Sequence, residues 1–550
     1  MPVISFRYDE LIEALGKDFP LTYLIEKIPM LGSDIEDYDE NKIDIELFPN
    51  RPDLYSLEGL VLALKGFFEI ETGLPVFNTK MSNIEVEVDP SVNEVRPYIV
   101  CGIVKGLNLT DREIERLIEF QEDLHWAIGR DRSKASIGIH DLDKVKPPFK
   151  YHAINPEEIS FVPLDMEEEM NLEEILRYHP KGIEYRHIVM SHSRYPIITD
   201  INHDVLSFPP IINGELTRVT EETKNIFIDI TGTDFRAIEN ALKILITSFH
   251  EKGEIYSLKI IYPEKEIITP DLSPTEMTLS KDFVKDLLGK EFEMDEIKHA
   301  LEKMRYGCTI EKDMVKVKIP CYRVDILHPV DIVEDVAIGY GYEKFSEKLP
   351  ETMTFGEKHP VEEISEDVRE LMISLGFQEV MTLSLTNEAD HYEKMNLKKC
   401  ESVEIENPVT EEHTIVRTSL LPNLMEQLKL NKRFDLPQRI FEIGDVVLLG
   451  ETETGGVNVR KVCGVTIHPK SNFSEIKSVV ITLLDNLGVD YRIEPRVHGS
   501  FINGRCAKII SNEREIGVFG EIHPKVIVNY GLAHPVVGFE ISIEDLREII

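Results

Sequence analysis

The chain has 550 residues, of which 42% are hydrophobic and 29% are charged, and its formal net charge is −39. The length and composition are those of a soluble protein of about three to five domains. No apolar run reaches the roughly 18 residues of a membrane span, the N-terminus lacks a signal-peptide pattern, and the six scattered cysteines form no CxxC pair, so a reducing cytoplasm is the expected compartment.

The negative charge also bears on partners. A field of this sign repels polyanions at long range. If the protein meets nucleic acid, most of the Lys and Arg that neutralise the phosphates must therefore come from elsewhere, and a partner chain is the simplest source.

Residues 1–85 form the first predicted domain, an N-terminal structural domain with an α/β pattern. Ile43 and Ile45 alternate with polar residues, as in a strand with one buried face. After a Pro-bounded turn, apolar side chains recur at helical spacing. They predict a helix that starts near Asp53 and is capped by Asp53 or Ser56.

Residues 86–265 form the second predicted domain, in which helical patterns lie between strands. Helices are expected at 111–129 and 236–252. The strands are expected in the apolar runs IEVEVDP, YIVCGIVKGL, KASIGIHDL, YPIIT and NIFIDITGTD. This mixture predicts an α+β domain with a mainly antiparallel sheet.

Residues 266–348 predict a small helical domain with a pair of strands. Two amphipathic helix patterns, each stopped by Gly, lie in SPTEMTLSKDFVKDLLG and EMDEIKHALEKMRYG, and a short strand lies in MVKVKIP.

Residues 349–550 alternate helices with strands of antiparallel type and form the fourth predicted domain. The whole chain is therefore expected to be an α+β multidomain protein.

Four carboxylates gather near the end of the third domain: Asp325, Asp331, Glu334 and Asp335. The last three fall within about one third of the circumference of a helix that begins at Pro329. Acids in a first helical turn are favoured by the helix dipole, so a solvated acidic face is one interpretation. A magnesium site is the other, because Mg²⁺ prefers hard oxygen ligands. The residues alone leave both open.

Polar side chains interrupt the apolar runs between residues 195 and 234. Asp229 and Thr231 stand two apart in an apolar strand and therefore share one face. An Asp in such a strand is costly to bury unless it is paired. The alternatives are an edge-strand surface or a pocket that hydrogen-bonds a polar ligand, and the polar candidates are Ser207, Asn213, Asp229, Thr231 and Thr233.

The fourth domain carries no complete catalytic constellation. Arg417 precedes a predicted helix start, and Arg439 and Glu442 lie on a predicted strand, all of which suit ordinary packing and capping. The sequence contains no GxxxxGK[ST] loop, no HExxH and no GxSxG motif.

Taken together, these segments resemble the β subunits of phenylalanyl-tRNA synthetases, in their archaeal form. The matching segments are NRPDLYSLEGLVLALKG, FPPIIN with IDITGTD, YRVDILHPVDIVEDVAIGYGYE, and then IENPV, VRTSLLPNL, QRIFEIG, HGSFINGR and GVFGEIHP. Each is moderately specific, and their order over nearly the whole chain makes the combination specific.

The resemblance implies a tetramer of two α and two β chains, in which the α subunit holds the active site for phenylalanine and ATP. The fourth domain is then expected to have a class II synthetase fold without its machinery, because the motif-2-like Phe441–Glu442 lacks its Arg and no third motif follows. Arg417, Asn423 and Glu442 are accordingly expected to be fold or α-contact residues, with no catalytic residue for aminoacylation in this chain.

The resemblance also implies that the second domain hydrolyses tyrosine wrongly attached to tRNA(Phe). Ser207, Asp229 and Thr231 match polar positions of the editing pocket, and Ile198 matches its apolar wall. No general base is apparent, so a water oriented by the tRNA terminus is expected to attack.

The third domain resembles small DNA-binding folds. In this family the acids at positions 325, 331, 334 and 335 bind Mg²⁺ together with the α subunit. Two other functions remain open at this point: a solitary tRNA-binding or scaffold protein built from degenerate synthetase domains, and a free-standing editing hydrolase.

Overall fold

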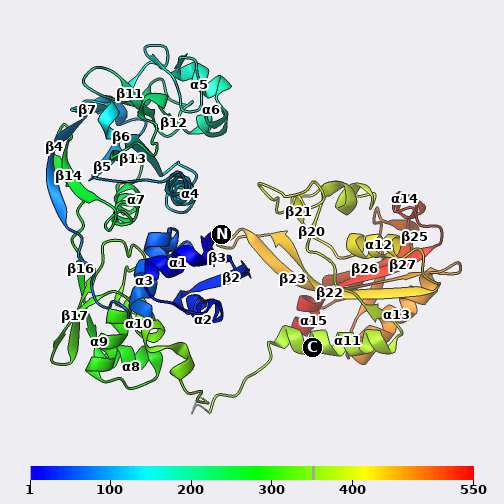
Figure 1. The fold of residues 1–550 in the computed structure, drawn as a ribbon. Helices are drawn as coiled ribbons and strands as arrows, with labels where there is room; N and C mark the ends of the chain where they lie inside the picture. The colour runs from blue at the N-terminus through cyan, green and yellow to red at the C-terminus, as the bar shows by residue number, and fades with distance from the viewer. Residues whose placement is uncertain (1, 350–352, 550) are drawn as a thin grey trace. The chain divides into compact units, whose positions relative to one another are not determined.

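A computed structural model describes residues 2–349 and 353–549. The chain divides into two compact units, Met1–Leu349 and Pro350–Ile550 (Figure 1). Both combine helices with β-sheets, so the expected α+β multidomain class is confirmed. Within the described residues, no helix combines the length and the apolar character needed to span a bilayer.

The first unit begins with a three-stranded antiparallel sheet in the order β1-β3-β2. The predicted helix is α3, Leu57–Phe67, and it starts later than expected because a 3-10 turn over Pro52–Leu54 comes first. Ser56 caps it by accepting a hydrogen bond from the Gly59 amide at 3.1 Å. The remaining elements are β1 Val3–Arg7, α1 Tyr8–Leu15, α2 Leu21–Lys27, β2 Ser33–Tyr38 and β3 Lys42–Leu47.

A ten-stranded sheet forms the centre of the first unit, in the order β12-β11-β10-β7-β4-β14-β5-β13-β6, with β15 paired to β14. All pairs are antiparallel except β14 with β4 and β4 with β7. The strands are β4 Thr79–Val88, β5 Tyr98–Lys105, β6 Ala135–Asp141, β7 Phe149–Ile154, β10 Tyr195–Thr199, β11 Val205–Phe208, β12 Ile212–Asn213, β13 Asn225–Gly232, β14 Glu254–Ile261 and β15 Glu266–Thr269.

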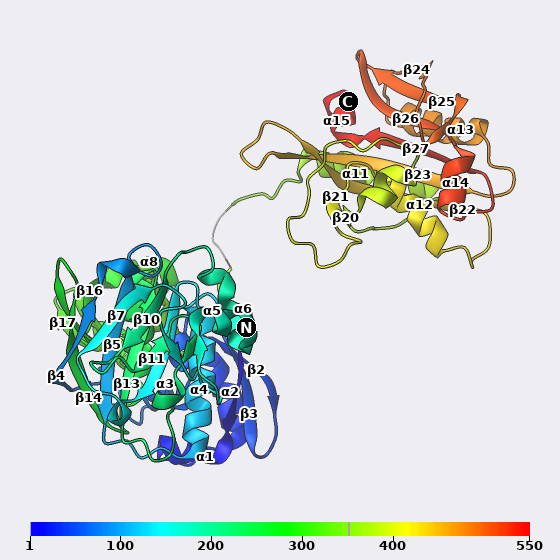
Figure 2. The ribbon, with the colours of Figure 1, turned by 90° about the horizontal axis from the view of Figure 1, so that it is seen from above.

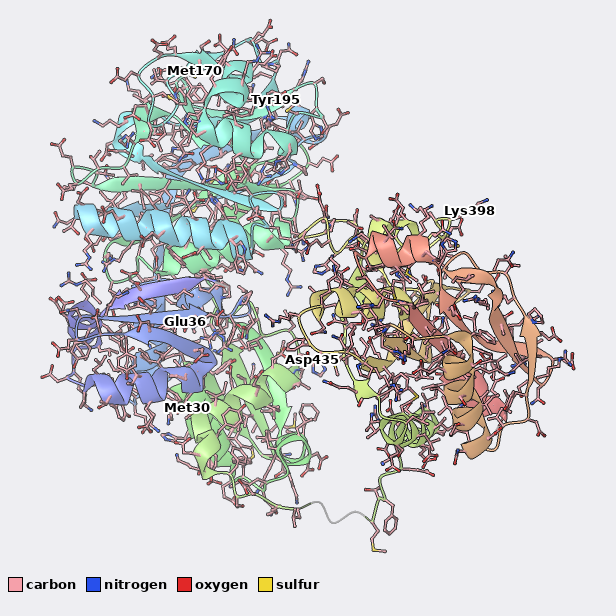
Figure 3. The ribbon with its side chains drawn as sticks, turned by 90° about the vertical axis from the view of Figure 1, so that its right-hand side faces the viewer. Met30, Glu36, Met170, Tyr195, Lys398 and Asp435 are labelled. Carbon is pink, nitrogen blue, oxygen red and sulfur yellow. The ribbon has the colours of Figure 1, made fainter. Side chains whose placement is uncertain are left out.

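The helices expected over 111–129 and 236–252 are present as α4, Asp111–Ala127, and α7, Phe235–Thr247. Asp234 caps α7, and the apolar face of α7 packs on β5 and β13. Figure 3 labels Tyr195, where β10 starts, and Met170 of the short strand β9 (Met170–Asn171) in the same lobe.

β13 is a central strand, held between β5 and β6 along its whole length. The edge-strand interpretation of Asp229 and Thr231 is therefore wrong. Their side chains project from the interior of a sheet, where a carboxylate requires a partner.

The third region contains a three-stranded sheet, β16-β18-β17, where a strand pair was predicted. Residues 275–280 were expected to begin a helix, but they form β16 because Leu279 pairs opposite Val315 and Ser280 then caps α8. The elements are β16 Thr275–Ser280, α8 Lys281–Leu288, α9 Met294–Lys303, β17 Gly307–Glu311, β18 Met314–Ile319 and α10 Pro329–Tyr340.

The second unit is built on a seven-stranded sheet in the order β19-β22-β23-β27-β26-β25-β24 (Figure 2). Its two faces bury separate cores, because neighbouring residues such as Ile440 and Phe441 point to opposite sides. One core packs on α11 Pro360–Ser374, α13 Phe473–Asn486 and α15 Ile543–Ile549, and the other on α12 Leu421–Leu430 and α14 Pro524–Asn529. The strands are β19 Gln378–Glu379, β22 Gln438–Leu449, β23 Gly456–Ile467, β24 Arg492–Pro495, β25 Phe501–Ser511, β26 Arg514–Ile522 and β27 Val536–Ser542.

Candidate functional site

A cavity of about 840 Å³ lies in the first unit beside β6, β11 and β13. Apolar side chains such as Ile137, Ile139 and Phe208 form part of its walls, and charged side chains such as Glu122 and Arg132 line it as well. The polar side chains that line it from the strands and the turn after them are Ser136, Ser207, Asn213, Thr217 and Asp229. An apolar cavity with a few convergent polar groups is the usual form of a small-molecule site.

Asp229 is a buried carboxylate that lines this cavity. Its side chain is 2% exposed, and its Oδ2 lies 2.7 Å from Nε2 of His140 on the neighbouring strand. The other ring nitrogen of His140 lies 2.8 Å from the Thr217 hydroxyl. Gly138 makes room for this pair, because a methyl group there would overlap both the carboxylate and the imidazole. One carboxylate oxygen is thus fixed by the protein while the side chain still lines the cavity.

Ser207 contributes an unsatisfied hydroxyl. It is 2% exposed and lines the cavity, and its Oγ has no hydrogen-bond partner in the part of the chain that the structure describes. Its backbone is held firmly, because it pairs with Ile198 on one side and Asn213 on the other. Leaving a buried hydroxyl unpaired costs about 1–3 kcal/mol, so this atom is poised to bond a ligand or a water.

Thr231 and Ile198 lie behind the cavity and do not line it. The Thr231 hydroxyl accepts a hydrogen bond from Arg96 Nε at 2.9 Å and lies 3.1 Å from the Ser136 hydroxyl. Ile198 is fully buried opposite Ser207. Of the four predicted pocket residues, the structure brings Ser207 and Asp229 to the cavity, while the other two support its walls.

The two further polar candidates, Asn213 and Thr233, also differ in whether they line the cavity. Asn213 lines the cavity and donates from Nδ2 to the Ile139 carbonyl at 3.4 Å. Thr233 is exposed and bonds the Ser133 carbonyl. Only the first of them belongs to the site.

His140 and Arg132 are two residues of the site that the sequence patterns did not predict. His140 stands two residues after Gly138 on an alternating strand, which places it on the same face as the cavity residues. That alternation was the available signal, but its partner Asp229 is 89 residues away in the sequence.

Arg132 gave no signal in the sequence. It is the last of three consecutive non-glycine residues with positive φ, Arg130 to Arg132. Such a backbone conformation costs free energy and persists only where the surrounding structure imposes it. Its guanidinium donates to the Ile211 carbonyl at 2.9 Å and stacks over the Tyr185 ring at 4.4 Å. Its Nε is buried and has no hydrogen-bond partner among the residues that the structure describes.

The four acids of the third region differ in their burial and in their hydrogen-bond partners. Asp335 is buried and accepts hydrogen bonds from the Tyr306 hydroxyl and, at 2.6 Å, from Arg323 Nη2. Asp325 pairs with the same guanidinium at 2.9 and 2.7 Å. Burial alone would raise the pKa of Asp325, but the positive charge of Arg323 lowers it below its ordinary value.

The other two acids sit at the start of α10. Asp331 accepts from the amides of Leu327 and His328, both at 2.7 Å, and so closes the helix N-terminus. Glu334 is exposed and has no hydrogen bond or ion pair among the described residues. The interpretation of the acids as a solvated helix face therefore does not hold for Asp335, which is buried.

These positions limit how a magnesium ion could bind. Within the described ranges, no group of three His, Cys, Asp or Glu side chains is arranged to hold a metal. Three of the four acids already accept hydrogen bonds from protein donors, so they do not fit a four-carboxylate cage. Glu334 fits a single ligand, because Mg²⁺ commonly takes one or two carboxylates and keeps several waters.

Comparisons with known proteins agree across the chain. Residues 346–543 match the family model "Phenylalanyl tRNA synthetase beta chain CLM domain", residues 277–342 the "tRNA synthetase B5 domain" and residues 108–249 the "B3/4 domain". The phenylalanine–tRNA ligase β subunit of Methanothrix thermoacetophila is 46% identical over 99% of this chain and 100% of its own length. The chain belongs to the phenylalanine–tRNA ligase β-subunit family.

One further relative and one solved structure are also similar to this chain. The β subunit of Archaeoglobus fulgidus is 45% identical over 99% of this chain and 98% of that protein. A crystal structure of an N-terminal fragment of the phenylalanyl-tRNA synthetase β subunit from Pyrococcus horikoshii is 40% identical, with a TM-score of 0.60, and covers 62% of this chain and 100% of the fragment.

In the region that matches the CLM domain model, the candidate residues are engaged within the fold. Arg417 is buried and donates to Glu442 at 2.8 Å and to the Asp445 carbonyl at 2.9 Å. The Thr382 hydroxyl donates to Glu442 at 2.6 Å. Asn423 donates to the Leu383 carbonyl at 2.9 Å. The arginine is thus occupied by a carboxylate of its own chain.

Proposed function

We propose that this chain is the β subunit of an α2β2 phenylalanine–tRNA ligase, and that it removes tyrosine wrongly attached to tRNA(Phe). A separate α subunit binds ATP and phenylalanine and performs the charging reaction in the cytoplasm. Family membership supports the subunit assignment. The occupied Arg417 supports the absence of an ATP site here, because binding a triphosphate requires free arginines.

Exposed apolar side chains of the second unit support a partner chain. Met381, Leu383 and Leu385 stand at alternate positions and are 95%, 66% and 40% exposed. A run of this kind on a soluble protein marks a surface that another molecule covers. The α subunit is the occupant that the family assignment supplies.

The need for editing follows from the chemistry of selection. A pocket shaped for phenylalanine discriminates against an added hydroxyl by only about a hundredfold. A second site that hydrogen-bonds this hydroxyl can select the wrong product instead. The Ser207 hydroxyl, which has no hydrogen-bond partner among the described residues and lines the same cavity as Asp229, is the single observation that carries this proposal.

Each polar residue then has a part in recognition. The Asp229 carboxylate accepts the phenolic O–H of tyrosine, and Ser207 bonds the same polar end. His140 and Thr217 keep the carboxylate oriented and are positioning residues. Water attacks the ester carbonyl, the bond from the carbonyl carbon to the ribose oxygen breaks, and the proton from the water passes to that oxygen, giving free tyrosine and tRNA.

The substitution Asp229→Ala tests the pocket. Loss of a hydrogen bond to a charged group costs about 1.5–3 kcal/mol, so hydrolysis of tyrosyl-tRNA(Phe) by the α–β complex should slow roughly 10- to 100-fold. The matched control is Asp200→Ala, which removes another buried aspartate of the same region that does not line the cavity. Wild-type hydrolysis by the Asp229 variant would refute the pocket assignment.

We also infer that Glu334 is the residue through which this chain contributes to a Mg²⁺ ion held jointly with the α subunit. Its exposure and lack of a partner support this, whereas Asp325, Asp331 and Asp335 keep the local structure in place. The bound ion would supply positive charge next to this acidic chain.

A further inference from the structure

A second cavity, of about 280 Å³, lies where the N-terminal sheet meets α4. Ile4 and Phe6 of β1 form one wall and Phe120 of α4 another. Its lining shares only Glu115 and Leu117 with that of the larger cavity. The N-terminal domain and the following domain therefore build a separate site together.

Tyr55 places an unsatisfied polar atom in this cavity. The residue is 2% exposed, and none of the described residues forms a hydrogen bond with its hydroxyl. Its position is fixed by the 3-10 turn before it and by Ser56, the cap of α3, after it. Burial raises the pKa of the hydroxyl, with the Asp123 charge as the next cause, so the group stays protonated and retains an oxygen that can accept a hydrogen bond.

Most charged side chains around the cavity already have partners in the chain. Lys252 lies 2.8 Å from Glu58 and 2.7 Å from Glu113. Arg112 lies 2.7 Å from Glu10, and Arg116 pairs with the same carboxylate. The positive groups nearest the walls are thereby neutralised and are not available to an anion.

Three acids line the cavity with no hydrogen bond or ion pair among the described residues: Glu115 and Glu119, which are exposed, and Asp123, which is half-buried. Burial raises the pKa of Asp123 to about 6, with Glu119 and Glu122 adding to the effect, so it remains mostly ionised at pH 7. An uncompensated carboxylate in a half-buried position is stabilised by a cation that also brings hydrogen-bond donors.

We propose that this cavity binds a small organic ammonium, whose N–H groups donate to the Asp123 carboxylate and the Tyr55 oxygen while its apolar body lies against Phe6 and Phe120. The volume admits only a small ligand. The unpaired acid disfavours an anion, and the apolar walls disfavour a bare metal ion. The site does not depend on the editing proposal.

Titration calorimetry on the full chain with 2-phenylethylamine as the probe tests this site. Saturable binding is expected. Asp123→Asn removes the negative charge at nearly constant shape and should weaken binding at least about tenfold, because hydrogen bonds to charged groups are the stronger ones. Tyr55→Phe removes the hydroxyl and should weaken binding by several-fold. Asp229→Ala, which alters only the other cavity, should leave the affinity unchanged.

Two neutral or negative analogues complete the test. 2-Phenylethanol and 3-phenylpropionate have similar apolar bodies but lack the ammonium, and both should bind more weakly than the amine. No saturable binding of the amine to the wild-type chain, or equal affinity for wild type and Asp123→Asn, would overturn the proposal. Neither result would affect the hydrolysis measured for the editing site.

Discussion

Asp229 and Asp335 are both buried acids, 2% and 3% exposed, yet their surroundings give them different capacities. Asp335 accepts from Arg323 and Tyr306 and points into a packed core. Asp229 contacts a histidine and lines a cavity. Both buried acids have a partner within the chain, but only the acid that lines a cavity can also bind a ligand.

The acids around Arg323 belong to a larger ionic core. Arg51 and Asp53 of the N-terminal domain form a buried bidentate pair at 2.9 and 2.8 Å, with the same two-residue spacing as Arg323 and Asp325. The charges of Arg323 and Asp325 act on Arg51, so the two pairs lie close together. This core links the first and third regions of the unit.

The largest expected effect comes from replacing Arg323, the residue that pairs with both Asp325 and Asp335. Arg323→Met leaves Asp325 and Asp335 buried without their partner, which should lower the free energy of unfolding by about 3–5 kcal/mol. Fluorescence of Trp126, the only tryptophan in the chain, follows unfolding of the first unit in urea.

Arg218→Met is the matched control, because Arg218 pairs with Glu215 and Asp165 at the surface. Its loss should change the free energy of unfolding by about 1 kcal/mol or less. If Arg323→Met were as mild as this control, the ionic core would not hold these regions together, and its acids would be free for another role.

The smallest effect on folding is expected from Glu334→Gln, since this side chain is exposed and has no partner within residues 2–349 and 353–549. Stability should change by no more than about 0.5 kcal/mol. Sedimentation of the α–β mixture with and without Mg²⁺ should show that the metal strengthens association for wild type and not for the variant. Unchanged dependence on Mg²⁺ in the variant would contradict the role of Glu334.

Most helices and strands could be predicted from local pattern, because alternation and helical spacing act over a few residues. The exception at β16 is instructive. Thr275 to Ser280 also fit an amphipathic helix, and the strand is selected by pairing with β18, more than thirty residues later.

The site could be predicted only in part for the same reason. Ser207 and Asp229 stood out as polar residues within apolar strands. His140 and Arg132 did not, because their importance arises from strand order and from a loop backbone that spacing alone does not specify. For the acids, the sequence showed the cluster but could not show that Arg323 and Tyr306 already occupy Asp335.

The most direct test of the central claim is the ratio of hydrolysis rates for tyrosyl- and phenylalanyl-tRNA(Phe), measured for the α–β complex carrying wild-type or Ser207→Ala chains. If Ser207 recognises the phenolic hydroxyl, wild type should strongly favour the tyrosyl ester, and the substitution should reduce this preference about 5- to 10-fold. An unchanged ratio in the Ser207 variant would contradict the account.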